Sequence, residues 1–465
     1  MPRTRAYLSL TVPLFLFGCG ASHGDVAAVG FGGSTGASGA CGVAGGGGAG
    51  GLDGGSAGAG GAAGGANGGS AGGVGGAAGG NGGVAGQTVL FPAFAPDLPT
   101  VLSAGGPVLA DPLVIPIFFS NEDPARIAAV SDFLSRLEGS DYWSATTAEY
   151  GVGPLVARAG VQVADAAPQT ISEGDLAAWL VATIEANRVP PPAADNVYLV
   201  YLPRTATISS VSGGVTSQSC RDFGGYHGQL TAAGQPIVYA VIAGCASYGA
   251  HLTPGETVHD LDYTTGLTTH ELVEAATDPF ETTDPAFNAT DPDHVAWALY
   301  LYGGEVADTC ELQPGAFFLE PTLGYTVQRM WSNVAAAAGH DPCSPLLGPL
   351  FFSATARLPV IPAGGWTTQA IALGAGATAA VEVDLASDAP TGQPWSVTAI
   401  DNAAERGAAA PALALSLDRT TGQNGDKLTL TIQVLAPDPS GFEGFILESS
   451  LAGRKFRTAG LVFQP

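Results

Sequence analysis

Apolar and polar positions follow one pattern before about residue 349 and another pattern after it. Before this point, three short apolar runs predict buried strands: 113–120, 196–202 and 236–243. Two segments with apolar side chains at helical spacing predict helices: 123–138 and 173–187, the second with Ser172 as its N-cap. Strands that alternate with helices predict an α/β or α+β domain.

After residue 349, apolar and polar side chains alternate in five short segments: 379–385, 395–400, 413–417, 427–435 and 445–449. Turn signals such as Gln423–Asp426 separate them, and no helix-length periodic segment is present. This pattern predicts a small all-β, Ig-like sandwich over 349–465. It contains no histidine or cysteine, so we interpret it as a binding or spacer module, with a purely structural role equally open.

The first residues have the pattern of an export signal. A short basic start is followed by an apolar run from Ala6 to Phe17 that is too short to span a bilayer. Leu-Phe-Gly-Cys at 16–19 resembles a bacterial lipobox, which predicts a signal peptide over 1–19 and lipidation of Cys19. An ordinary signal peptide cut near Ala21 is the alternative. Gly20 supplies no acidic retention signal, so we expect an exported protein anchored by lipid to the outer membrane or cell surface.

Residues 20–88 consist mostly of Gly and Ala, with scattered Ser and Asn. Such a tract cannot bury enough apolar surface to fold, so it predicts a flexible tether. Two domains then follow, over 89–348 and 349–465. The net charge of −25 argues against nucleic acid and anionic membrane surfaces as partners, so we expect membrane contact through the lipid alone.

The cysteines agree with export. Cys19 is assigned to the lipid and Cys41 lies in the tether, which leaves four cysteines and three possible pairings. Proximity in the sequence favours two pairs: Cys220–Cys245 and Cys310–Cys343. Disulfides are expected in an oxidising compartment, and buried free thiols are the alternative.

A predicted helix over 265–276 carries the candidate chemistry. His270 and Glu274 are four residues apart, so they share one helix face and can reach the same ion. Glu271 projects about 100° away, where it could hold a water molecule. This is the His-Glu-x-x-His zinc arrangement with a carboxylate in place of the second histidine. The plain alternative is a solvated helix face with an incidental histidine.

A third ligand is needed, and Glu305 and Asp308 are the first two candidates, because they follow the motif by some thirty residues and lie just before Cys310. His227 and His259 rank next. The acidic loop 278–293 offers another possibility, a structural calcium site, although it lacks the spacing of an EF-hand. Zinc is therefore the expected ion and calcium the alternative.

Several segments together resemble the EXORDIUM / phosphate-induced protein family, in its bacterial branch. The resemblance covers about 105–345 and rests on these segments: 130–133, 142–143, 146–150, Cys220 with 225–227, 270–279 and 304–310. Plant members are secreted, wall-associated growth-response proteins without an assigned reaction, so the resemblance implies export and a fold and leaves the reaction open. It also implies that Gln328, Trp331, Ser332 and Asn333 belong to the final strand of the domain, near the site.

Our leading hypothesis is a surface lipoprotein with a zinc-dependent hydrolase domain, most simply a peptidase acting on a peptide or cell-wall substrate. Glu271 would be the general base, and His227 or Tyr325 would stabilise the oxyanion. The alternative is a non-catalytic protein associated with the cell wall or a glycan, with a structural metal. The exposure of Glu271 separates the two, because a catalytic base must lie in a cleft.

Overall fold

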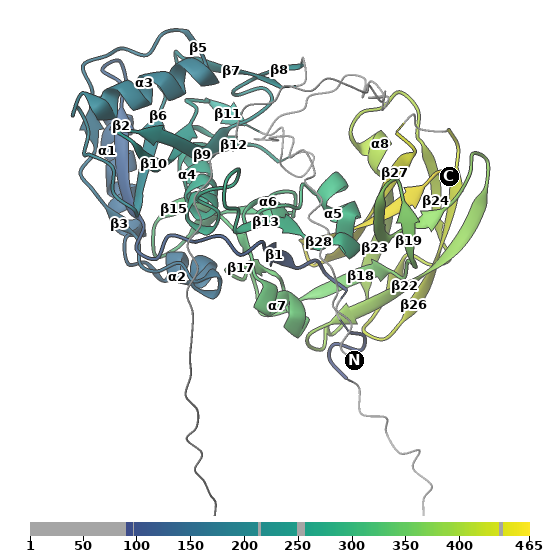
Figure 1. Cartoon of the computed structure of the whole chain (residues 1–465). Helices are drawn as coiled ribbons and strands as arrows, with labels where there is room; N and C mark the ends of the chain where they lie inside the picture. Colours follow the sequence, from purple (N-terminus) through teal and green to yellow (C-terminus); the bar gives the residue numbers. More distant parts are fainter. Residues whose placement is uncertain (1–89, 96, 213–214, 249–255, 437–439) are drawn as a thin grey trace, which may run out of the picture. The chain divides into compact units, whose positions relative to one another are not determined.

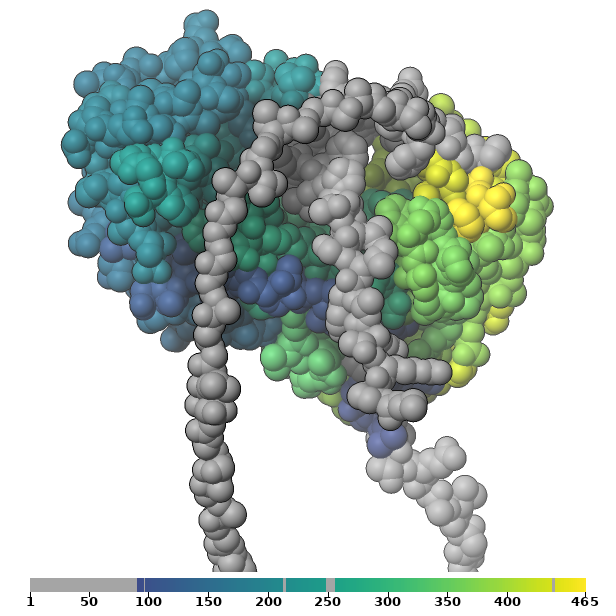
Figure 2. Space-filling model, in the orientation of Figure 1, coloured from purple at the N-terminus to yellow at the C-terminus, as the bar shows by residue number. Residues whose placement is uncertain are grey.

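The computed structural model describes residues 90–95, 97–212, 215–248, 256–436 and 440–465. The predicted signal peptide, the lipidation site at Cys19 and the tether over 20–88 lie outside the described residues. Residues 90–465 belong to one compact unit, and Figure 2 shows one face of it in the orientation of Figure 1. Figure 1 shows its elements along the chain, from the blue strands near residue 113 to the yellow strand at the end.

A mixed sheet carries the first part of this unit. Three parallel strands form its centre: β2 (Leu113–Phe118), β6 (Asn196–Tyr201) and β10 (Gln235–Ile242). β9 (Gly225–Ala232) pairs antiparallel with β10, and two short strands pair with β2: β3 (Val156–Ala157) and β4 (Val161–Gln162). All six residues of β6 are buried, which explains why the central strands appear in the sequence as continuous apolar runs.

Three longer helices accompany this sheet: α1 (Pro124–Leu137), α3 (Glu173–Glu185) and α4 (Asp260–Thr277). Asp123 caps α1 by accepting from Ala125 N–H, and Ser172 caps α3 by accepting from Asp175 N–H. Every residue of α4 from 263 to 277 is buried. This helix contacts β9 and β10 as well as the later strand β15 (Tyr325–Gln328), so it lies between two layers of strands (Figure 1).

Short elements make up the rest of the first region. The remaining helices are α2 (Asp141–Thr147), α5 (Val295–Tyr300), α6 (Asp308–Glu311) and α7 (Asn333–Ala338), with 3-10 turns η1 (Ala148–Tyr150) and η2 (Pro292–His294). One small sheet has three strands: β5 (Thr170–Ser172), β7 (Thr207–Ser212) and β8 (Val215–Gln218). Four pairs of strands complete it: β1 (Val101–Ser103) with β13 (Phe287–Thr290), β11 (Ser247–Tyr248) with β12 (Val258–His259), β14 (Phe317–Glu320) with β15, and β16 (Met330–Trp331) with β17 (Cys343–Ser344).

The second region, from residue 352 onward, is a sandwich of two sheets. The first sheet has the order β18 (Phe352–Ala356), β22 (Thr378–Ser387), β26 (Lys427–Val434), β24 (Leu413–Leu417). The second has the order β21 (Ile371–Ala372), β28 (Arg454–Phe463), β27 (Phe442–Leu451), β23 (Trp395–Asp401), β25 (Thr421–Gly422). A separate hairpin and a short helix complete it: β19 (Val360–Ala363), β20 (Trp366–Gln369) and α8 (Asn402–Glu405). Alternate residues of β26 are buried, so the alternation seen in the sequence marks the core face.

The two regions share no β-sheet among the described residues, but they share buried side chains. Gln313 Nε2 donates to Arg457 C=O, and Arg457 N–H donates to Gln313 Oε1. Ile446 and Phe456 of the sandwich belong to the apolar core of the first region. The boundary near residue 349 therefore separates the sheets without separating the cores.

The predicted fold class, an α/β or α+β metallopeptidase-like domain followed by an all-β sandwich, is wrong, because the described chain is mostly strand. Among the described residues, 37% lie in strands and 22% in helices, and the strands form many small sheets. The helices α1 and α3 and the three central strands were visible in the sequence through their residue patterns, whereas α4 was predicted from the His270–Glu274 spacing and Pro279. The short pairs, such as β14–β15 and β16–β17, carry too few residues for a periodic signal, so they looked like loops.

Two disulfides join Cys220 to Cys245 and Cys310 to Cys343, which are the pairings that sequence proximity favoured. Disulfides of this kind fit an exported protein. Among the described residues, no helix combines the length and apolar character needed to cross a membrane.

Candidate metal centre

Helix α4 places two donors in the interior. His270 and Glu274 stand one turn apart, and His270 Nε2 lies 3.1 Å from Glu274 Oε2. The helix tolerates this burial because its threonine hydroxyls donate to carbonyl groups four residues earlier, as Thr268 does to Thr264. It begins five residues before the predicted start and ends at Thr277, where Pro279 disfavours continuation.

The other ring nitrogen of His270 is held in place. Its Nδ1 lies 2.9 Å from Gln328 Oε1, and Gln328 Nε2 donates to Ala307 C=O at 2.8 Å. Since the amide nitrogen of Gln328 is used as a donor, its oxygen is the acceptor, and His270 carries its proton on Nδ1. Nε2 is then left with a lone pair that faces carboxylates, as in metal-ligating histidines.

Asp308 completes a group of three donors with His270 and Glu274. Its Oδ1 lies 3.5 Å from His270 Nε2, and its backbone N–H donates to Glu274 Oε1. The donor atoms of the three residues all lie within 4.8 Å of one another. Ligands of a tetrahedral zinc ion at 2.0–2.1 Å are separated by roughly 3.3 Å, so the distances of 3.1 and 3.5 Å from His270 Nε2 match this geometry. The Cys310–Cys343 disulfide anchors the helix that carries Asp308.

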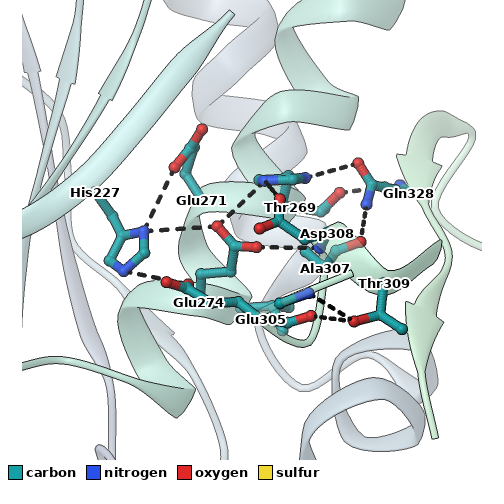
Figure 3. A network of polar contacts seen from close by, with 12 residues as sticks. His227, Thr269, Glu271, Glu274, Glu305, Ala307, Asp308, Thr309 and Gln328 are labelled. Atoms are coloured by element: carbon teal, nitrogen blue, oxygen red, sulfur yellow. Dashed lines mark hydrogen bonds and ion pairs between the residues drawn. The ribbon is translucent and has the colours of Figure 1, made fainter. Parts of the chain in front are cut away.

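His227 approaches from the opposite side, on β9, where it pairs with Ala240 of β10. Its Nδ1 lies 3.5 Å from Glu274 Oε2 and 3.8 Å from Glu271 Oε2, and its Nε2 lies 3.5 Å from Glu305 Oε2. Figure 3 shows the ring of His227 between the carboxylates of α4 and that of Glu305. The structure thus brings His227, Glu305 and Asp308 to the motif helix.

Glu271 is 1% exposed and lies against the backbone of β9. A Cβ atom added at Gly225 would come within 2.6 Å of Glu271 Oε1, so only glycine leaves room for this carboxylate. Glu271 Oε1 is buried and accepts no hydrogen bond. The expected exposed cleft at Glu271 is not present.

The charges of the cluster strongly perturb one another. Burial alone would lower the pKa of His270, but the carboxylates of Glu274 and Glu271 outweigh burial and hold this pKa well above its usual value. Burial would raise the pKa of Glu274, but the charges of His270 and His227 lower it to about 2. For Asp308, burial and the charge of Glu274 hold the pKa well above its usual value. The two neighbouring carboxyl groups therefore have pKa values that are shifted in opposite directions.

The donor set fits a divalent cation. His227 Nε2 and Glu305 Oε2 are buried without hydrogen-bond partners, which is costly unless an ion satisfies them. The imidazole of His270 among the donors favours zinc or a similar transition metal, because calcium and magnesium prefer oxygen ligands alone.

Other residues singled out in the sequence lie elsewhere. The hydroxyl of Tyr325 donates to Asp132 on α1, and His259 lies in β12 at the start of α4. Ser332 and Asn333 bind Glu149 instead of the centre. Within the acidic loop 278–293, the described donors form no metal group of their own.

Three carboxylates near the centre were not assigned to it from the sequence. Glu281 groups with His227 and Glu305, Glu311 lies one turn after Asp308, and Asp278 accepts from Ala286 N–H. Burial raises the pKa of Glu311 to about 8. The available signal was their position: Asp278 and Glu281 directly follow the motif helix, and Glu311 follows Cys310.

Comparisons with known proteins identify no functional neighbour. No family model matches the sequence, and no curated protein matches it. Domains 4 and 5 of the S-layer protein SbsC share 14% identity over 24% of this chain and 53% of that chain, with a TM-score of 0.16. The titin M3 domain shares 10% identity over 25% of this chain and 95% of that chain, with a TM-score of 0.15. The chain thus spans about half of the S-layer structure, and TM-scores this low support no argument.

Proposed function

We propose that this protein is an exported metalloprotein in which His270, Glu274 and Asp308 bind one zinc ion. The observation that carries the proposal is their mutual geometry, in which His270 Nε2 lies 3.1 and 3.5 Å from two carboxylate oxygens while Gln328 fixes its other nitrogen. An ion at this position joins α4 to the segment that begins at Glu305.

The burial of Glu271 favours a structural ion over a catalytic one, which is the form of the proposal in which the protein is a non-catalytic one associated with the cell wall or a glycan. A general base must reach a water molecule that substrate can also reach, and Glu271 is packed against Gly225.

Hydrolysis, most simply of a peptide, is the second candidate, and one observation favours it. The side chain of Asp308 is 25% exposed and that of Glu305 is 14% exposed, so the centre can be reached from this side. A bound zinc ion lowers the pKa of its water and polarises a carbonyl group. In this candidate Glu271 accepts the proton from water, and His227 donates to the developing oxyanion.

The first test is metal content, measured by mass spectrometry on the full chain with Cys19 and Cys41 alkylated, beside the His270→Ala variant. We expect bound zinc in the wild type and one zinc fewer in the variant. Equal metal content in the two proteins, or calcium in place of zinc, would reject the proposed centre.

Thermal unfolding and peptide hydrolysis then separate the two candidates. A structural ion predicts that a chelator lowers the unfolding temperature and that Glu271→Gln changes no activity. A hydrolase predicts peptide cleavage that Glu271→Gln abolishes without loss of zinc. Cleavage that survives in Glu271→Gln would reject this residue as the base.

We also propose that the chain is a lipoprotein related to the bacterial branch of the EXORDIUM family. The lipobox sequence that ends at Cys19 supports the first proposal, and the order of the shared motifs over 105–345 supports the second. Labelling with palmitate should be lost in Cys19→Ser. Incorporation of label into that variant would exclude this anchor. The net charge of −25 supports the absence of nucleic-acid partners.

A further inference from the structure

The second nitrogen of His227 faces a group of donors that the centre described above does not use. Nε2 is buried, has no hydrogen-bond partner and lies 3.5 Å from Glu305 Oε2, which is also buried and unpartnered. The side chain of His227 is only 6% exposed. Figure 3 shows this edge of the ring directed at Glu305.

Glu281 supplies a third donor from the loop after α4. The donor atoms of His227, Glu281 and Glu305 all lie within 4.8 Å of one another. We propose that these three residues form a second divalent-cation site beside the first, with zinc or manganese as the class of ion. One imidazole and two carboxylates suit such ions and leave positions free for water or an anionic ligand.

The surroundings of His227 favour this assignment over a role as a further ligand of the first ion. A neutral imidazole binds a metal through one nitrogen and carries a proton on the other. Nδ1 faces Glu274 Oε2 at 3.5 Å and Glu271 Oε2 at 3.8 Å, which are acceptors for an Nδ1–H group. Metal-ligating histidines commonly donate their other N–H group to a carboxylate. In that arrangement Glu271 accepts from His227 Nδ1–H, a role for which it needs no exposed cleft.

The second site differs from the first in exposure. At the first site only Asp308 is partly accessible, with a side chain that is 25% exposed, whereas His227, Glu281 and Glu305 are each partly accessible as residues. Solvent therefore reaches more of the ligands at the second site than at the first. The second site and the centre of His270, Glu274 and Asp308 share no ligand, so either site can fail without the other. The hydrolytic candidate alone gives His227 a different role.

Native mass spectrometry of the full chain during zinc titration, with Cys19 and Cys41 alkylated, tests the proposal. We expect two zinc ions per wild-type chain, one in Glu305→Gln, one in Glu281→Gln and one in His270→Ala. The matched control is Glu138→Gln, which alters an exposed carboxylate and should retain two.

The outcomes separate the two sites. A single zinc in the wild type that Glu305→Gln retains and His270→Ala loses overturns the second site and leaves the first intact. A single zinc that only Glu305→Gln and Glu281→Gln lose overturns the first site and keeps the second. The number of zinc ions bound by the wild type does not depend on whether any variant folds. One zinc in the wild type is therefore enough to reject the presence of both sites.

Discussion

The metal centre and the sandwich both bury charged side chains, but they compensate for this burial differently. In the sandwich, Arg457 is 4% exposed, and its guanidinium group binds Glu448 and Glu405. At the centre, by contrast, carboxylates outnumber the two histidines, and several of their oxygen atoms have no partner. Buried charges that satisfy one another stabilise a fold, whereas an unbalanced group indicates a ligand.

The largest expected effect is that replacing a buried glutamate by glutamine changes the free energy of unfolding with opposite sign in the two regions. With metal removed, Glu311 keeps its proton up to about pH 8 in the folded state but ionises near 4.5 when unfolded, so stability falls as pH rises between these values. Glu311→Gln removes this loss and should raise the free energy of unfolding at pH 8 by up to roughly 4 kcal/mol. Denaturant unfolding in the presence of a chelator measures this.

The matched change in the sandwich is Glu448→Gln. It removes the charge that faces Arg457, so it should lower the free energy of unfolding by roughly 2 kcal/mol. If Glu311→Gln and Glu448→Gln both lower stability, the buried carboxylates of the centre are compensated like those of the sandwich. That result would contradict the difference between the two regions.

Removal of the Cys310–Cys343 disulfide should act on the centre more than on the sandwich. The bond closes a loop with a sequence separation of 33, so the double change to serine should cost about 3.5 kcal/mol by the chain-entropy argument. Because this disulfide anchors the helix of Asp308, zinc affinity should fall as well. Calorimetric unfolding measures the loss of stability, and zinc titration measures the loss of affinity. The control is removal of the Cys220–Cys245 disulfide. If the two variants lose the same zinc affinity, anchoring of the Asp308 helix by Cys310–Cys343 is unimportant.

His294 gives a pH effect far from the centre. Burial lowers its pKa, but hydrogen bonds and charges from Asp291 and Asp97 raise it to about 9. Because the folded pKa lies above the unfolded value of 6.5, the contribution is present below 6.5 and is lost as pH rises through 9. It should not exceed roughly 3 kcal/mol, and His294→Gln should abolish it in unfolding experiments across this range. An unchanged pH profile in the variant would refute the assignment.

The smallest expected effect concerns Gln328. Gln328→Leu removes the acceptor of His270 Nδ1–H while leaving the ligands in place, so zinc affinity should fall by about 10–100-fold. Competition with a chelator of known affinity measures this. The change Gln162→Leu, on β4 and outside both donor groups, should leave affinity unchanged.

The sequence predicted parts with long patterns or strong spacing. The central strands and the sandwich strands lie close to their expected positions, because each has enough residues to show its pattern. The helix that carries His270 and Glu274 was predicted from the spacing of its motif, and it begins five residues earlier than expected. The choice between Glu305 and Asp308 could not be made, since it depends on how α6 meets α4. The structure places Asp308 with His270 and Glu305 with His227. The role of Glu281 could not be predicted, because this residue lies in a turn after α4 and a turn has no repeating pattern of apolar and polar residues.

The packing of Ile446 and Phe456 into the core of the first region has a consequence for the order of events during biogenesis. Residues 98–345 contain both disulfides and the metal ligands, yet their apolar core is complete only when strands β27 and β28 are present. A chain still being translocated can pair its cysteines before this core closes. Final closure must therefore follow delivery of the last strands, and a chain truncated at residue 348 should expose an incomplete core to proteases.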